Sequence, residues 1–177
     1  MIQRIQSFYL ILAACCMALC FMFPVAKYNA DMGNQIAKGE LTLIANDNPE
    51  MMNQIANIDP VVEFSQRGLV TTWPLIAIAA LCAVIAVVCI FLYRNRVRQM
   101  RIVAVGFVLS VVYAFLIFFW AVDSYAKTMT EVLHCQQPQV TWFVGAYAPI
   151  AAIALFFLAQ RAIRRDEEKV RAADRLR

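Results

Sequence analysis

The sequence predicts an all-α membrane protein with four transmembrane helices in a single domain, residues 1–177. Hydrophobic residues make up 62% of the chain and charged residues 16%, whereas about a quarter of a typical soluble domain is charged. The apolar residues gather in four blocks of about 20 residues, the length with which a helix crosses a bilayer. None of the blocks contains Lys, Arg, Asp, Glu or His, and they cover approximately residues 5–26, 70–93, 102–122 and 142–159.

The basic residues predict the orientation of these helices. Twelve of the sixteen Lys and Arg residues lie in the N-terminal segment, in the central loop 94–101 or in the tail 160–177. The positive-inside rule places such segments in the cytoplasm. We therefore expect a multi-pass protein of a bacterial inner membrane, with both termini in the cytoplasm and periplasmic loops at 27–69 and 123–141.

The larger periplasmic loop, residues 27–69, carries signals for short elements. Asn48-Pro49-Glu50 supplies an N-cap residue, a proline at the first helical position and an acidic residue in the first turn. Apolar residues follow at helical spacing, which predicts a short helix near residues 49–58. Weak alternation predicts short strands at residues 39–44 and 61–64, which would pair as a small β-ribbon.

The central loop holds four arginines, Arg94, Arg96, Arg98 and Arg101. Their simplest role is to keep the loop in the cytoplasm, because one Arg at the bilayer centre costs about 2.5–3.5 kcal/mol. They are also candidates for docking a partner or for binding anionic lipid headgroups, at about 1 kcal/mol per residue. Nucleic acid is not an expected partner, since the basic residues of the tail alternate with acidic ones.

The third block contains the clearest helix-packing pattern. Gly106, Ser110 and Ala114 recur at four-residue spacing, so they share one helix face on which a neighbouring backbone can approach closely. We expect this face to pack inside the four-helix bundle, and a homodimer contact is the alternative. In the tail, Glu167 and Arg171 form a favourable i, i+4 pair, so we expect the last helix to continue into the tail.

The ends of the chain carry a resemblance. Met1-Ile-Gln-Arg-Ile-Gln6 opens the chain, the basic central loop leads into Arg101-Ile102, and Arg161-Ala-Ile-Arg-Arg-Asp-Glu-Glu-Lys-Val-Arg-Ala-Ala-Asp-Arg-Leu-Arg177 closes it. These segments resemble an uncharacterised family of small four-span inner-membrane proteins from Bacteroidetes-type bacteria, one of the families described as domains of unknown function. The resemblance implies an inner-membrane location and four spans, and it brings no activity, ligand or catalytic residue.

Few residues carry reactive groups. Cys135 is the one cysteine outside the apolar blocks, which makes it a candidate for an intermolecular disulfide. Glu131, His134 and Cys135 lie at i, i+3 and i+4 and would share a helix face, so they are a candidate metal site, with a solvated loop as the alternative. No phosphate-binding loop or nucleophile motif occurs, and we expect no catalytic site, cofactor or metal.

These patterns favour a non-catalytic structural or accessory subunit. The chain would assemble with other inner-membrane proteins or with further copies of itself, and membrane lipids would surround it. The alternative is a carrier or binding protein for a small apolar or lipid-like molecule held between the helices. An enzyme that uses Glu131, His134 and Cys135 is the third hypothesis.

Overall fold

The computed structural model describes residues 3–31, 36–44, 61–64, 72–92, 95–133 and 137–175. Within these ranges, four helical segments are long and apolar enough to cross a membrane, and they cover Ile5–Met22, Trp73–Phe91, Val97–Glu131 and Val144–Val170. Their length and composition fit the multi-pass membrane protein that the hydropathy pattern predicted. The helix predicted near residues 49–58 lies outside the described ranges.

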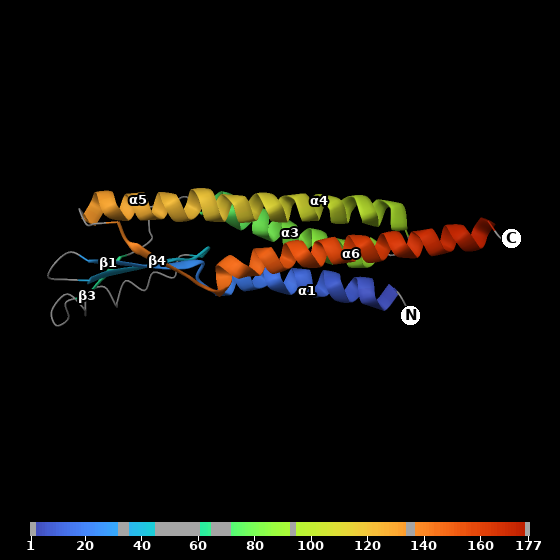
Figure 1. Ribbon diagram of the computed structural model, residues 1–177, viewed down its shortest axis with the longest axis horizontal. Coiled ribbons are helices and arrows are strands. Elements are labelled where there is room, and N and C mark those ends of the chain that lie inside the picture. Colours follow the sequence, from blue (N-terminus) through green and yellow to red (C-terminus); the bar gives the residue numbers. More distant parts are fainter. Residues whose placement is uncertain are drawn as a thin grey trace. The chain divides into compact units, whose positions relative to one another are not determined.

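The first, second and fourth apolar blocks form helices α1, α3 and α6 (Figure 1). α1 covers Gln3–Met22 and α3 covers Trp73–Phe91. α6 covers Val144–Arg175 and continues from the apolar block into the charged tail without a break. The prediction that the tail is helical and continues the last helix is therefore confirmed.

The third block forms a longer helical run than predicted. It consists of α4 (Arg96–Phe115), the π-helical segment η2 (Leu116–Ala121) and α5 (Val122–Leu133). The prediction of a loop at residues 94–101 is wrong from Arg96 onward, because α4 begins there. The Gln99 N–H donates to the Asn95 carbonyl at 3.0 Å, and Arg, Gln and Met are good helix formers.

The predicted loop 123–141 also contains regular structure. α5 continues through its first part, where Asp123 and Lys127 form an i, i+4 ion pair of 2.5 Å. Tyr125 and Met129, also four residues apart, are fully buried on one face of this helix. The charged and polar residues of α5 lower its mean hydropathy, and for this reason a hydropathy argument ended the helix too early.

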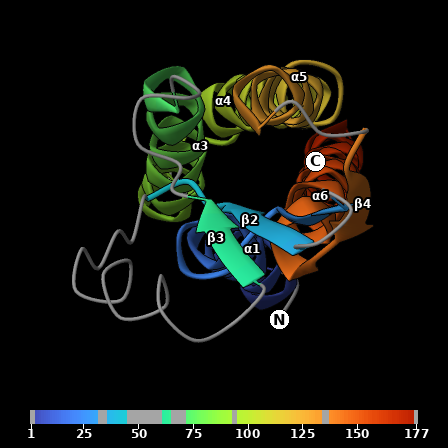
Figure 2. The same ribbon diagram turned by 90° about the vertical axis from the view of Figure 1, so that its left-hand side faces the viewer.

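A four-stranded sheet completes the fold, with the order β3-β2-β1-β4, and Figure 2 shows β3 beside β2. β1 is antiparallel to β2 and to β4, whereas β2 and β3 are parallel. The predicted strands at 39–44 and 61–64 correspond in part to β2 and to β3, and the other two strands were not predicted. The strands cover Ala26–Asp31 (β1), Ile36–Leu41 (β2), Val61–Phe64 (β3) and Gln139–Trp142 (β4).

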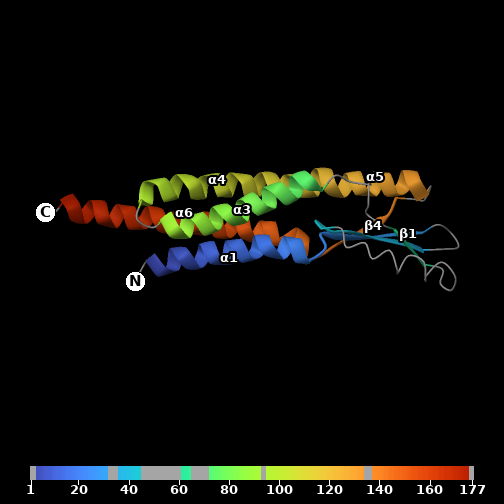
Figure 3. The same cartoon turned by 180° about the vertical axis from the view of Figure 1, so that it is seen from behind.

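Contacts divide the chain into two compact units. Unit 1 comprises Met1–Leu19, Ala77–Tyr113 and Ala148–Arg177, and unit 2 comprises Cys20–Ile76 and Ala114–Tyr147. In unit 1, parts of α1, α3, α4 and α6 run alongside one another (Figure 3). All four helices contribute to one buried apolar cluster, which contains Leu10, Ala13, Ala86, Cys89, Val103, Phe156, Ala159 and Ile163.

Unit 2 has an aromatic core between its sheet and α5. The rings of Tyr28 on β1 and Tyr125 on α5 have centroids 4.5 Å apart, and the Tyr28 hydroxyl donates to the Val122 carbonyl at 3.1 Å. A Cβ on Gly39 would lie 2.6 Å from the Tyr125 hydroxyl oxygen. Because Gly39 has no side chain, Tyr125 can occupy this space. The two tyrosines therefore join the sheet to α5.

Candidate functional site

Polar side chains are buried at the end of unit 1 where α1 and α4 begin. Gln6, 6% exposed, donates its amide N–H to the carboxylate of Asp166 on α6, which is 8% exposed. Gln99, 3% exposed, donates to the Cys89 carbonyl at 2.9 Å. That carbonyl lies in the last turn of α3, where no partner exists within the helix. The two glutamines therefore join α1 to α6 and α3 to α4.

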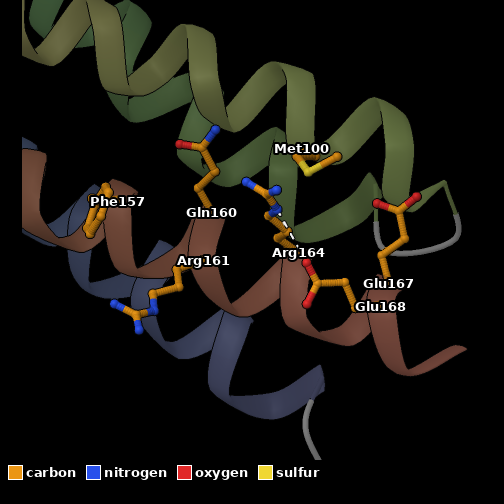
Figure 4. Close-up of a pocket in the computed structure, with 7 residues that line it drawn as sticks. All are labelled: Met100, Phe157, Gln160, Arg161, Arg164, Glu167 and Glu168. Carbon is orange, nitrogen blue, oxygen red and sulfur yellow. Dashed lines mark ion pairs between the residues drawn. The ribbon is translucent and has the colours of Figure 1, made fainter. Parts of the chain in front are cut away.

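A cavity of about 690 Å³ opens on α4 and α6 of the same unit (Figure 4). Met100 of α4 and Phe157 of α6 are its apolar lining residues, and Met100 lies beside Arg164 rather than beside Phe157 (Figure 4). The other lining residues are polar or charged. The cavity lies where the apolar sequence of α6 ends, because Phe157 is near the end of the apolar block and Gln160 opens the charged tail. The polar lining consists of Gln160, Arg161, Arg164, Glu167 and Glu168.

The polar side chains of the cavity point in different directions. Gln160, Arg164 and Glu167 project toward α4, where Met100 lies, while Arg161 points away from α4 (Figure 4). Positions i, i+4 and i+7 share one face of a helix, which explains the common direction. An amide, a guanidinium and a carboxylate thus stand in a row along α6.

Arg164 also forms an ion pair with Glu168, in which Nε and Oε1 are 3.4 Å apart. The two side chains are 76% and 66% exposed, and such surface pairs contribute less than about 1 kcal/mol. A guanidinium has five N–H donors, so this contact uses only part of the donor capacity of Arg164. Two cations and two anions therefore line the cavity.

The charged end of α6 is a second surface feature. Figures 1 and 3 show its C-terminal turns reaching past the ends of α1, α3 and α4 within unit 1. A more open hollow of about 490 Å³ lies on this part of the helix. Its lining residues are all exposed, and they are Arg165, Glu168, Lys169 and Ala172.

Two of the arginines predicted to bind lipid or a partner lie on the surface of α4. Arg98 and Arg101 are exposed, and Met100 between them lines the cavity. Arg94 lies outside the described residues, and of Arg96 only the helical backbone is described. The central basic segment and the tail therefore lie at one end of unit 1.

The predicted small-residue face of α4 contacts two helices of unit 1. A Cβ on Gly106 would lie 2.9 Å from the ring of Phe156 and 3.0 Å from Cγ2 of Ile85. Ser110 is fully buried, and its hydroxyl donates to the Gly106 carbonyl at 2.8 Å. Ala114 belongs to unit 2, where it is half-buried. Close packing within the chain is sufficient to explain the small size of Gly106 and Ser110.

The residues considered for metal or thiol chemistry lie largely outside the described ranges. His134 and Cys135 are not described, and Glu131 is exposed on α5. Among the residues that the structure describes, no group of three His, Cys, Asp or Glu side chains is placed to hold a metal ion. The candidate metal site and the intermolecular disulfide therefore stay predictions.

Sequence reasoning missed the cavity and the buried glutamines. Gln6 lies inside the first apolar block, and a buried amide is costly unless it is hydrogen-bonded. The position of Gln6 in an apolar block therefore indicated that a neighbouring helix supplies a polar partner for its side chain. The spacing of Gln160, Arg164 and Glu167 was also visible, but the helix that this face meets depends on the tertiary structure.

Comparison with protein families gives a match over nearly the whole chain. The model of the family described as Domain of unknown function (DUF4293) matches residues 2–176. The matched range includes the helices and strands of both units and every residue that lines the cavity on α4 and α6. Comparison with curated proteins and with solved structures finds no match.

Proposed function

The chain belongs to the DUF4293 family, and from this premise we propose that it is a non-catalytic accessory subunit of a larger complex in a bacterial inner membrane. In this proposal the four apolar helical segments cross the membrane. The N-terminus, the start of α4 and the tail lie in the cytoplasm. The distribution of Lys and Arg along the chain supports this orientation.

The charged end of α6 is the observation that carries the proposal. Its exposed residues alternate in sign, as Arg165, Glu168 and Lys169 do. A helix of alternating charge fits a partner helix with the complementary alternation, as the flanking positions of a coiled coil do. Because α6 also crosses the membrane in this proposal, the expected partner is an integral membrane protein with a charged cytoplasmic helix.

Exposed apolar side chains support the membrane location. They occur on each helix of unit 1, and such continuous apolar surface is rare on soluble monomers. Lipid tails would cover these side chains, so their exposure carries no penalty in a bilayer. Examples on the four helices are Phe8, Leu81, Val84, Val108 and Phe157.

The carrier hypothesis remains the alternative proposal, and the cavity on α4 and α6 bears on it. Met100 and Phe157 are apolar lining residues of this cavity, but the other lining residues are polar or charged. Burying a purely apolar molecule there would remove water from charged side chains, which is costly. The cavity therefore favours an amphiphilic ligand over a purely apolar one.

Charge reversal on α6 tests the subunit proposal. The double variant R165E/K169E changes two exposed side chains, and K38E on β2 is a matched control because Lys38 is also exposed. Each protein is purified from membranes in mild detergent, and the co-purifying proteins are quantified by mass spectrometry. We expect the wild type and K38E to retain the same integral membrane protein and the double variant to retain about tenfold less.

Two results would contradict the proposal. One is a double variant that retains the partner at the wild-type level. The other is a wild-type chain that purifies alone under every gentle condition. The orientation has its own test, because a fluorescent protein fused after Arg177 folds in the cytoplasm but stays dark if it is exported unfolded. We expect a fluorescent fusion, and a dark fusion at full expression would invert the topology.

A further inference from the structure

One exposed face of α4 in unit 1 carries two arginines followed by three valines. Arg98, Arg101, Val105, Val108 and Val112 are all exposed, whereas the buried residues of the same helix lie on its other side. We propose that this face binds one anionic phospholipid of the cytoplasmic leaflet, with its phosphate at the arginines and an acyl chain along the valines. The inference rests on the membrane location and orientation proposed above and needs no protein partner.

The spacing of these five residues places them on one side of the helix. They follow one another at steps of three, four, three and four residues, which keeps them within one stripe of a helix with about 3.6 residues per turn. Side chains three or four positions apart are neighbours, with Cβ atoms about 5–6 Å apart. The arginines and the valines therefore form one continuous surface, and all five residues belong to unit 1.

The two arginines carry charge that α4 itself does not compensate. The helix contains no Asp or Glu, and neither Arg98 nor Arg101 forms an ion pair with another residue in the described part of the chain. Two guanidinium groups three positions apart can reach one phosphate, which they bind through parallel charge-assisted N–H···O bonds. An anionic headgroup is therefore the ligand that complements this end of the face.

The valines match an acyl chain in position and in length. An apolar block begins directly after Arg101, so a phosphate held there lies at the edge of the hydrocarbon region. From Arg101 to Val112 the helix rises about 16 Å, which is close to one leaflet of a hydrocarbon core of about 30 Å. Val105, Val108 and Val112 are each more than 40% exposed, and their side chains offer only methyl groups. One lipid of the cytoplasmic leaflet therefore fits the whole face.

The arginines also disfavour two other occupants of this face. Copies of the chain in one membrane share one orientation, so a two-fold contact through α4 would bring each arginine against its counterpart. Such a juxtaposition of like charges is costly. A zwitterionic lipid carries an ammonium group that the arginines repel, which weakens its binding relative to that of an anionic lipid.

Native mass spectrometry of the full chain in mild detergent tests the lipid class. Equal amounts of phosphatidylglycerol, phosphatidylethanolamine and phosphatidylcholine with identical acyl chains are added, and the retained lipid is counted. Phosphatidylglycerol has a net negative charge and no ammonium, so we expect about tenfold more of it to be retained than of either zwitterionic lipid. Equal retention of the three lipids, or a preference for a zwitterionic one, would overturn the proposal.

Two double variants assign the headgroup contact. R98Q/R101Q should abolish the preference for phosphatidylglycerol. R161Q/R165Q removes the same charge from exposed positions of α6 in the same unit, and it should keep the preference. Glutamine is a good helix former, and circular dichroism checks that both variants are folded. An unchanged preference in R98Q/R101Q, or an equal loss in the two variants, would overturn the site. A dimer that R98Q/R101Q strengthens would assign the face to a second copy instead.

A photoreactive phosphatidylglycerol locates the acyl chain. Its diazirine lies midway along one chain, and the crosslinked peptides are identified after the purified chain is reconstituted in vesicles. We expect the crosslinks to gather on Val105–Val112 in the wild type and to spread over the helices of unit 1 in R98Q/R101Q. Millimolar glycerol 3-phosphate should leave the wild-type crosslinks in place. An even spread in the wild type, or complete loss of the crosslinks to glycerol 3-phosphate, would overturn the lipid assignment.

The lipid proposal and the subunit proposal fail through different results. Because the lipid experiments use purified chain, equal retention of the lipids leaves docking through Arg165 and Lys169 unaffected. Full retention of the partner by R165E/K169E would contradict the subunit proposal but leave the lipid preference unaffected, since the exposed face of α4 is unchanged. A dark fusion after Arg177 would remove the orientation on which the lipid proposal rests.

Discussion

Different kinds of contact stabilise the interior of unit 1 and the interior of unit 2. In unit 1 the helices pack through side chains, and the Phe156 ring lies over Gly106. In unit 2 backbones meet directly, because the strands form a sheet and the Gly145 N–H donates to the Pro24 carbonyl at 3.1 Å. Side chains can change rotamer to admit a new atom, whereas a backbone held by hydrogen bonds cannot move without breaking them. Unit 2 should therefore tolerate added volume less well than unit 1.

The substitution Gly145→Ala should have the largest effect on stability. Its Cβ would lie 2.6 Å from the carbonyl oxygen of Pro24 and 2.7 Å from that of Phe23. These oxygens belong to the backbone, so we expect a loss of about 3 kcal/mol in the free energy of unfolding. Denaturation in detergent, followed by circular dichroism, measures the change. Ala151→Val, an exposed change on the same helix, is the control, and equal stability of the two variants would contradict the comparison.

The substitution Gly106→Val tests the corresponding position of unit 1. A new Cβ would meet Phe156 at 2.9 Å and Ile85 at 3.0 Å. Both contacts are with side-chain atoms that can shift, and we expect a smaller loss of about 2 kcal/mol. The same denaturation experiment measures it. A loss larger than that of Gly145→Ala would reverse the assignment of the more tolerant unit.

Tyr28→Phe tests the aromatic core of unit 2. It removes the hydrogen bond to the Val122 carbonyl, 3.1 Å long, and should cost about 1 kcal/mol. Retention of full stability would show that the hydroxyl contributes nothing to the link between β1 and α5.

Tyr28 also predicts a dependence on pH. Burial raises the pKa of Tyr28 above 10, and the nearby Tyr125 and Asp123 raise it further. Because the folded pKa exceeds the unfolded value of about 10, the contribution of the neutral phenol is fully present below pH 10 and is lost as the pH rises through the folded pKa. The wild type should lose more stability than Tyr28→Phe above pH 10. Parallel curves for the two proteins would contradict this.

The ion pair between Lys27 and Glu40 on neighbouring strands should have the smallest effect. Its Nζ and Oε1 atoms are 2.6 Å apart, but the side chains are 39% and 51% exposed. Surface pairs contribute about 0.2–1 kcal/mol, so Glu40→Gln should cost less than about 1 kcal/mol. The difference from the wild type should shrink at high salt. A cost that does not change with salt would mean that the pair acts through packing.

The difference between the units also explains which parts of the fold were predictable. Unit 1 consists of apolar helices, and hydropathy located each of them because a membrane-spanning length of apolar sequence is a local signal. Two of the four strands in unit 2, β1 and β4, were missed, because they pair with each other across more than a hundred residues. Ala26 and Trp142, which are partners in that ladder, had been assigned to the ends of two apolar blocks.

The sequence predicted the charged residues of the candidate site but not their arrangement in space. The charges of the tail and their spacing were visible in the sequence, and so was the basic segment at the start of α4. The meeting of Met100 with Arg164 and Glu167 in one cavity depends on how α4 packs against α6. Buried apolar contacts determine that packing, and the sequence pattern does not show which apolar residues contact each other.

Photo-crosslinking in living cells at position 169 tests the central claim most directly. A photoreactive amino acid replaces Lys169 on the exposed end of α6 or, as a control, exposed Asn29 on β1. We expect the residue at position 169 to crosslink to one integral membrane protein. This product should be lost when Arg165→Glu is added, and position 29 should give no such product. Crosslinks from position 169 that reach only lipid, or that persist unchanged with Arg165→Glu, would contradict the proposed docking surface.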